Sequence, residues 1–289
     1  MEYRVRHRTT YRYLQPVAQS VHLLHLEPRT TGRQTVDAAT VAVAPAPAWR
    51  ARRADAFGNH AEWLALDEPH LTLEITAESR VVAASMPSPE AGGDPWETIR
   101  AGLELPADPA SRAAVDFLFD SPNVRSTPEI LAYARRSFPA GRPALEGAVE
   151  LMGRIHADFR YDTTVTDATT PVERVFEIRA GVCQDFAHLA IACLRSLGLP
   201  ARYVSGYLLT RPPPGRPRLV GADASHAWLA LWCPPVGWVD LDPTNDVLPD
   251  EGHVTVAWGR DYGDVAPISG VVVGGGDHTI EVGVDVVPV

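Results

Sequence analysis

The stretch AGVCQDFAHLAIACLRSLGLPARYVSGY, residues 180–207, predicts a long helix followed by a strand. After the cysteine, apolar residues recur three and four positions apart, which is the spacing of a helix with one buried face. Gly198 and Pro200 end the helix, because glycine favours a helix C-terminus and proline cannot continue one. The helix begins at Cys183, just after Gly181, so the sequence places a cysteine at a helix N-terminus.

Helices are expected before this stretch and strands after it. Residues 96–158 show helical spacing in DPASRAAVDFLFD, TPEILAYARRSF and ALEGAVELMGRIHADF, and TPVERVFEIRAG predicts a further short helix that ends at Gly181. The segments ARYVSGYLL, HAWLALWC and GWVDLDP have the composition of strands. Helices followed by an antiparallel sheet indicate an α+β fold. The proline-rich RPPPGRPR, residues 211–218, is expected to be a surface hairpin loop.

The first part of the chain is β-rich. YRVRHRTTYRY and HLTLEITAESRVVA alternate apolar and polar residues, and Gly58-Asn59 lies between two strand-like segments, which predicts a hairpin. We therefore expect a sandwich-like domain at 1–84 and a Pro/Gly-rich linker at 85–95. Residues 96–289 would then hold the helical segment, the catalytic core and the C-terminal strands.

Composition narrows the class of protein. The chain has 289 residues, 45% of them hydrophobic and 21% charged, as in ordinary globular proteins. The net charge of -10 argues against a nucleic-acid partner, and all 26 basic residues are arginine. Three cysteines do not make a disulfide framework. We see neither a signal peptide nor a membrane-spanning run, so the expected location is the cytoplasm, away from membranes.

The three cysteines differ in position. Cys193 lies on the apolar stripe of its helix and Cys233 ends an apolar strand, so both fit buried hydrophobic residues. Cys183 lies in the first helical turn, where unpaired N–H groups and the helix dipole favour a thiolate. The sequence therefore singles out Cys183 as a candidate nucleophile.

A thiolate needs a base, and the base needs an orienting partner. His226 in ASHAWLAL follows small residues that leave access to its imidazole. The next strand, GWVDLDPT, ends at Asp242 before a proline. A hairpin of the two strands would set His226 beside Asp242, and Asp240 is a competing choice on the same strand face.

Taken together, GVCQDFAHLAIACLRSLGLPARYVSGY, SHAW and GWVDLDPTN resemble the transglutaminase-like superfamily of papain-like thiol enzymes. Within it, the chain is similar to bacterial proteins often described as cysteine proteases. FRYDTTVTDATTP before the cysteine and GRDYGDVAPISGVVVGGG after the aspartate extend the resemblance, and YRVRHRTTYRY and AFGN resemble their β-rich N-terminal domain. The resemblance covers nearly the whole chain, least of all 86–150.

The resemblance implies Cys183 as nucleophile, His226 as base and Asp242 as orienter. It favours Asp242 over Asp240 because the family's aspartate lies four residues after the tryptophan of the Gly-Trp pair. The animal cross-linking enzymes hold the oxyanion with a tryptophan upstream of the cysteine, and this chain has none between 96 and 183. Tyr161, with the Cys183 backbone N–H, is our candidate replacement, although a core aromatic would also explain this tyrosine.

Further residues could border the cleft: Gln184, Trp228 and Asp261. Each has a structural alternative, since Gln184 could face solvent, Trp228 could belong to the core and Asp261 could stabilise a turn. Asp185 complements the helix dipole and His188 fits a packed histidine, so neither is a catalytic candidate.

The expected activity is acyl transfer from an amide or peptide bond through a cysteine thioester, by hydrolysis or transamidation. The expected partner is a peptide or protein amide substrate, and the sequence leaves the oligomeric state open. No cofactor is expected, and no metal, because closely spaced pairs of zinc ligands are missing from the sequence. Two alternatives remain: a catalytically silent peptide-binding module of the same fold, and a scaffold that works through its β domain.

Overall fold

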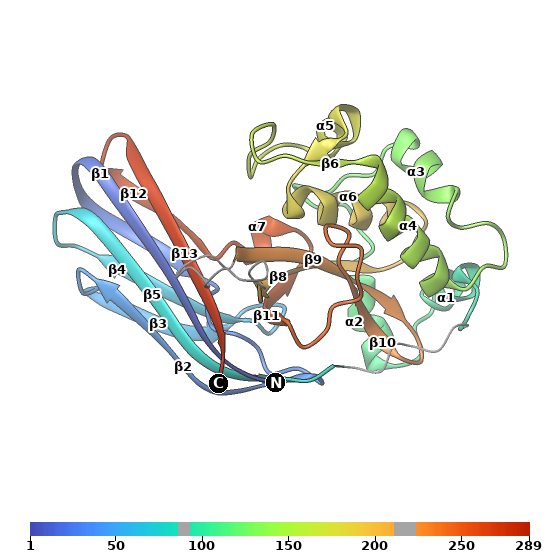
Figure 1. Cartoon of the computed structure of the whole chain (residues 1–289), viewed down its shortest axis with the longest axis horizontal. Coiled ribbons are helices and arrows are strands. Elements are labelled where there is room, and N and C mark those ends of the chain that lie inside the picture. Colours follow the sequence, from blue (N-terminus) through green and yellow to red (C-terminus); the bar gives the residue numbers. More distant parts are fainter. Residues whose placement is uncertain (86–92, 211–223) are drawn as a thin grey trace, which may run out of the picture.

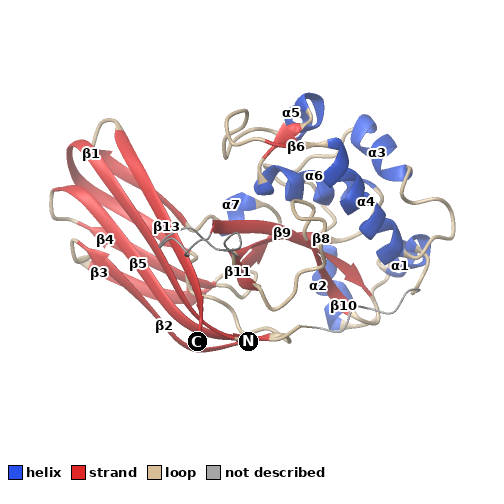
Figure 2. Cartoon of the chain, in the orientation of Figure 1, coloured by secondary structure: helices blue, strands red, loops and turns tan. Residues whose placement is uncertain are grey.

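The structure is a computed structural model that describes residues 1–85, 93–210 and 224–289. A large β domain lies beside a second layer in which helices cover a smaller sheet (Figures 1 and 2). The predicted α+β fold with a β-rich N-terminal region is therefore confirmed. Most of the predicted linker and the predicted loop at 211–218 fall outside the described residues. Within the described part of the chain, none of the helices is long and apolar enough to cross a membrane.

The β domain is a seven-stranded sheet organised around one very long strand, β1 (Glu2–Leu24). The first half of β1 pairs with β5 and β13, and its second half pairs with β4 and β12. Buried side chains from both halves form a common apolar cluster. The remaining strands of this domain are β2 (Gln34–Ala44), β3 (Trp49–Ala54), β4 (His60–Leu66), β5 (His70–Ala83), β12 (Ile268–Gly274) and β13 (His278–Pro288).

Alternation of buried and exposed residues at the start of β1 explains how this sheet meets the rest of the molecule. Tyr3 and Val5 are buried, whereas the intervening Arg4 and Arg6 are exposed. Tyr3 and Val5 belong to the same buried cluster as the helices of the second layer. The predicted hairpin is also present, because β3 and β4 pair across a turn that contains Gly58 at φ 73°.

The two C-terminal strands belong to the β domain. The predicted division placed C-terminal strands in 96–289, after the helical segment and the catalytic core; these strands, β12 and β13, pair antiparallel with β1. The β domain is thus built from both ends of the chain, which lie close together in Figure 1. Such pairing joins residues more than 240 positions apart, and local sequence patterns carry no information on it.

The second layer contains a four-stranded antiparallel sheet in the order β10-β9-β8-β11, which we call the catalytic sheet because the predicted base and orienter, His226 and Asp242, lie on it or directly after it. Helix α6 (Cys183–Ser196) packs on it and is buried along most of its length. The strands are β8 (Ala201–Leu208), β9 (Ala224–Cys233), β10 (Gly237–Leu241) and β11 (His253–Gly259). The other helices are α1 (Trp96–Gly102), α2 (Pro109–Val115), α3 (Pro128–Arg135), α4 (Ala144–Asp158), α5 (Val172–Ile178) and α7 (Tyr262–Val265).

The helix before the cysteine ends earlier than predicted. Helix α5 stops at Ile178, and Arg179 adopts the left-handed conformation, with φ 54° and ψ 37°. Ala180–Gly181 instead forms the short strand β7, which pairs in parallel with β6 (Arg160–Tyr161). This pairing places Tyr161 directly opposite Gly181, two residues from the cysteine. Because α5 ends early, the segment that leads into Cys183 can pair with the strand that carries Tyr161.

Candidate active site

Cys183 is the first residue of α6 and is half-buried. Asp185 stabilises this end of the helix, because its Oδ2 accepts hydrogen bonds from the Val182 backbone N–H (2.8 Å) and from the Thr166 hydroxyl (2.7 Å). Gly181 is required here, since a Cβ at this position would lie 2.5 Å from the same Asp185 oxygen. The glycine thus lets the chain turn tightly into the helix that carries the thiol.

The catalytic sheet carries the other two predicted residues. His226 lies near the start of β9, and Asp242 follows directly after the end of β10. The His226 Nε2 and the Asp242 Oδ2 are 2.7 Å apart, and the exposed fractions of these residues are 7% and 0%. The Cys183 side chain adjoins His226 closely enough to raise the pKa of the imidazole. The structure therefore brings Cys183, His226 and Asp242 together in one continuous contact.

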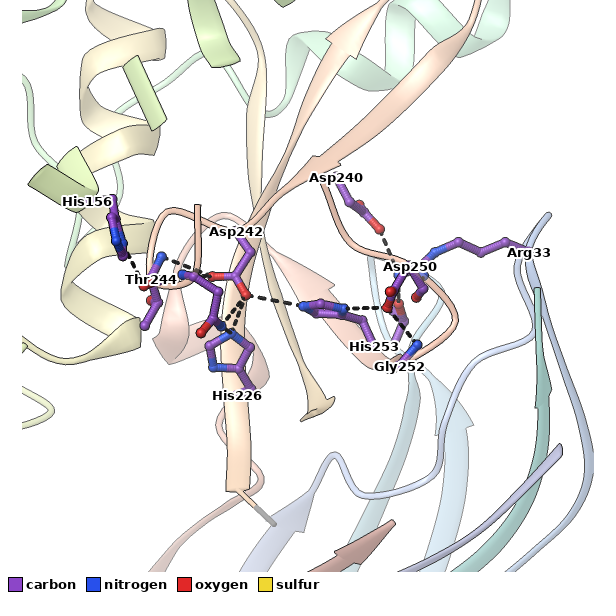
Figure 3. A network of polar contacts seen from close by, with 11 residues as sticks. Arg33, His156, His226, Asp240, Asp242, Thr244, Asp250, Gly252 and His253 are labelled. Carbon is purple, nitrogen blue, oxygen red and sulfur yellow. Dashed lines mark hydrogen bonds and ion pairs between the residues drawn. The ribbon is translucent and has the colours of Figure 1, made fainter. Parts of the chain in front are cut away.

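Asp242 is held by donors on every side (Figure 3). Its Oδ1 accepts from the backbone N–H groups of Thr244 (3.0 Å) and Asn245 (3.3 Å). Its Oδ2 is shared by His226, the Asn245 side-chain amide (2.7 Å) and the His253 Nε2 (3.2 Å). A carboxylate with this many fixed donors remains charged and cannot rotate away from His226.

The charges in the site favour an imidazolium. Burial alone would lower the pKa of His226, but the hydrogen bond to Asp242 and the contact with Cys183 outweigh it and raise the pKa to about 9. For Asp242, burial opposes ionisation, yet its hydrogen bonds to His226, His253 and Asn245 hold the pKa well below the usual value. A positive His226 between Cys183 and Asp242 is the charge pattern that stabilises a thiolate.

Asp240, the competing orienter, faces a different partner. Its Oδ2 lies 2.9 Å from the Arg33 Nη2, and this arginine comes from the β domain. Asp240 and Asp242 were equivalent by strand periodicity. They separate in the structure because β10 ends at Leu241, so that Asp242 leaves the strand and turns toward His226.

Two of the three residues predicted to border the cleft are buried. Trp228 is 0% exposed and packs beside His226, at 6.0 Å between ring centroids. A Cβ on Gly206, which lies opposite His226 on β8, would come within 2.4 Å of the Trp228 ring, so the glycine makes room for it. Asp261 is 1% exposed and caps α7 by accepting from the Gly263 backbone N–H at 2.8 Å. Trp228 therefore packs in the protein interior and Asp261 caps a helix, so neither forms the surface of a cleft.

Tyr161 and Gln184 lie at the surface beside the thiol. Tyr161 is 54% exposed, and the pKa of its hydroxyl is raised by partial burial and by the neighbouring Cys183 and Asp185. Gln184 follows the nucleophile candidate in α6 and donates from Nε2 to the Ala168 carbonyl oxygen at 3.2 Å. Tyr161 is therefore close enough to feel the charge of Cys183, whereas the Gln184 side chain is directed to Ala168.

Three residues that we predicted to have structural roles, His188, Cys193 and Cys233, are all buried. His188 is buried, its Nε2 accepts from the Tyr262 backbone N–H at 3.1 Å, and burial lowers its pKa to about 4. Cys193 and Cys233 are buried in the main core, where burial raises the pKa of each thiol to about 12. Neither cysteine is suited to act as a thiolate.

His253 and Asn245 belong to the site but were not predicted. Asn245 stands in the quoted motif GWVDLDPTN without a role, and no local pattern marks His253. His226, Asp242 and His253 bring three potential metal ligands within 4.8 Å of one another. Their mutual hydrogen bonds already account for this proximity, and a metal on the His226 Nε2 would displace its bond to Asp242.

Comparison with known proteins identifies the family of the chain. The bacterial transglutaminase-like N-terminal region matches residues 3–82, and the transglutaminase-like superfamily matches residues 132–243. An uncharacterized protein of Mycobacterium tuberculosis is 43% identical over 296 residues, which cover 99% of this chain and 92% of the relative. The chain belongs to the transglutaminase-like superfamily. The core match of this superfamily spans Cys183, His226 and Asp242.

Two further relatives extend the comparison. A protein-glutamine gamma-glutamyltransferase of Pseudomonas aeruginosa is 36% identical over 98 residues, which are 33% of this chain and 15% of that enzyme. A solved structure from Cytophaga hutchinsonii, named "putative cysteine protease", shares the fold with a TM-score of 0.75 and 20% identity, covering 100% of this chain and 91% of the other. The fold shared with this structure covers the whole chain, β domain included.

Proposed function

We propose that this transglutaminase-like protein catalyses acyl transfer from an amide or peptide bond, with Cys183 as nucleophile, His226 as acid and base, and Asp242 as orienter. The observation that supports it most is the chain of contacts from the half-buried Cys183 thiol to the adjoining His226 imidazole and, over a 2.7 Å hydrogen bond, to the buried Asp242 carboxylate. Nothing in a purely structural role requires a half-exposed cysteine at the end of that chain.

In the proposed reaction the Cys183 sulfur attacks the amide carbonyl carbon while His226 holds the proton. The Nε2 of His226 is taken by Asp242, which leaves Nδ1 to serve the thiol and the leaving group. The tetrahedral oxyanion is stabilised by the Cys183 backbone N–H and the Tyr161 hydroxyl. Collapse of this intermediate breaks the C–N bond, His226 protonates the departing amine, and a thioester remains. Water then releases an acid, or a second amine releases a new amide.

A silent peptide-binding module of the same fold is the second candidate. It would need the cleft but not a raised pKa of about 9 at His226 or the five donors around Asp242. These features are costly to build into a buried site, because two charged groups lose hydration there. They favour an enzyme over the binding module.

The proposal is tested with a reporter amine and a glutamine-rich protein such as casein. We expect the wild-type protein to release ammonia from casein or to couple the amine to it, and Cys183→Ala to do neither. The chain has no lysine, so its own side chains offer no amine that competes in the assay. Cys193→Ala is the matched control, because that thiol is buried away from the site. Equal activity in Cys183→Ala would exclude the proposed nucleophile.

Tyr161→Phe tests the oxyanion assignment. Loss of one oxyanion donor typically lowers kcat by about 100-fold or more, with little change in KM. We expect a fall of that order, because the β6–β7 pair holds the Tyr161 backbone opposite Gly181 and the ring lies edge-on to Phe186, and neither contact needs the hydroxyl. The measurement is kcat and KM on the substrate found above. An unchanged kcat would assign Tyr161 to the wall of the cleft instead.

The natural substrate is proposed only by class, as a peptide or protein amide. The net charge of -10 disfavours nucleic acid as a partner. A cytoplasmic location stays a prediction from the sequence.

A further inference from the structure

We infer that the β domain completes the active site, because it fixes the edge strand β11 and, through His253, the Asp242 carboxylate. The inference rests on the proposed roles of Cys183, His226 and Asp242. It gives the β domain a part in catalysis and makes His253 a positioning residue. Figure 3 shows the contacts that lead from Arg33 of the β domain to His226.

β11 is an edge strand of the catalytic sheet, and two amide side chains of the β domain cover its free side. Gln34 donates to the Thr255 carbonyl oxygen (2.8 Å) and accepts from the Thr255 N–H (2.9 Å). Asn59 makes the same pair of bonds with Trp258, at 2.8 and 2.9 Å. Each amide thus replaces one residue of a missing neighbouring strand. Gln34 and Asn59 are both buried, so water does not compete for these hydrogen bonds.

Arg33 of the β domain hydrogen-bonds to β11 and to two segments next to its start. Its guanidinium donates to the Asp250 carbonyl oxygen (2.8 Å), to the Asp240 carboxylate (2.9 Å) and to the Thr255 hydroxyl (3.4 Å). These acceptors belong to the loop before β11, to β10 and to β11 itself. One side chain of the β domain therefore holds together the three segments that surround Asp242.

His253 connects the loop that Arg33 binds to the Asp242 carboxylate. It is the first residue of β11 and is buried, with its ring edge-on to Trp228 at 5.3 Å between centroids. Its backbone N–H donates to the Asp250 carbonyl oxygen at 3.1 Å, the same oxygen that Arg33 binds. From this position the His253 Nε2 reaches the Asp242 Oδ2 at 3.2 Å. Release of the loop would thus free one donor of the catalytic carboxylate.

Loosening this contact has a predictable consequence. If Asp242 is no longer held in place, it contacts His226 for less of the time, and the imidazolium loses its main stabilising partner. The thiolate–imidazolium pair would then form only at higher pH. A role limited to folding would lower the melting temperature and leave the pH dependence of Cys183 reactivity unchanged.

The test is the pH dependence of iodoacetamide labelling of Cys183 in the full chain, followed by peptide mass mapping at 25 °C. For Arg33→Met we expect labelling at pH 6 to slow about tenfold, the usual effect of losing one hydrogen bond to a charged group, and the acid limb to move to higher pH. Hydrogen exchange should rise in 250–259. Arg80→Met is the matched control, because it removes an exposed ion pair with Glu2 on the same β domain.

A double-mutant cycle separates positioning from general loosening. With His253→Leu as background, Arg33→Met should have little further effect on labelling, because both act through one contact. His253→Gln, which keeps a donor at the Nε2 position, should restore most of the rate. Asp240→Asn offers a milder second way to weaken Arg33 if Arg33→Met folds poorly.

The outcomes separate the two proposals. Slow labelling of Cys183 at pH 6 in the wild-type protein would contradict the proposed function. Fast labelling in the wild type with an unchanged pH profile in Arg33→Met and Asp240→Asn would overturn this inference alone. Independent, additive effects of Arg33→Met and His253→Leu would also overturn it.

Discussion

In His226→Ala, iodoacetamide labelling of Cys183 at pH 6 should slow by about 100-fold or more. An ordinary thiol, with a pKa of about 8.5, is ionised to well under one per cent at that pH. In the wild-type protein a charged His226 between the thiol and Asp242 supports the thiolate. Removing the imidazole removes that support and leaves the buried negative charge of Asp242 without a positive neighbour in the site, which disfavours a second negative charge nearby.

The other cysteines serve as an internal control for this experiment. Cys193 and Cys233 are buried and their pKa values are raised to about 12, so both should stay unlabelled in either protein. His60→Ala, at an exposed position of the β domain, should label like the wild type. Equal labelling of Cys183 in the wild type and in His226→Ala would make the silent binding module the leading reading.

The free energy of unfolding should depend on pH through His226. Its pKa is raised from 6.5 to about 9, so its contribution is fully present below pH 6.5 and is lost as the pH rises through about 9. At about 1.4 kcal/mol per pH unit, this pKa change corresponds to about 3 kcal/mol. The pKa of Asp242 is lowered, so its contribution is present above pH 3.8 and is lost as the pH falls toward the folded-state pKa.

Urea denaturation of wild type and His226→Ala from pH 5 to pH 9.5 measures this contribution. The difference in free energy of unfolding should stay constant up to about pH 6.5 and then shrink by about 3 kcal/mol toward pH 9. The comparison with a variant is necessary because His7 and His188, whose pKa values burial lowers to about 4, add their own pH dependence in both proteins. A difference that stays flat to pH 9.5 would show that folding does not raise the pKa of His226.

Local patterns predicted the elements that hold the site. The helix after Gly181, the strand with His226 and the Gly58 hairpin all appear as expected, because each repeats apolar residues with the period of its own backbone. The nucleophile candidate was found because a helix N-terminus is visible in sequence.

What the patterns missed depends on contacts between distant segments. Trp228 and Asp261 were candidates for the cleft surface, but they are buried, since exposure depends on what packs above a residue and not on its neighbours in sequence. The parallel β6–β7 pair and the end of α5 at Ile178 likewise depend on a partner 20 residues away.

The sequence by itself determined that this chain carries a cysteine at a helix N-terminus, a histidine on a strand and an aspartate after the next strand. Only the tertiary structure showed that Asp242 meets His226 while Asp240 binds Arg33, that His253 joins them, that Gln34 and Asn59 of the β domain cover β11, and that strands from both chain ends build this domain. The reason is physical: secondary structure follows from short-range periodicity, whereas hydrogen bonds across 200 residues exist only once the sheets have packed.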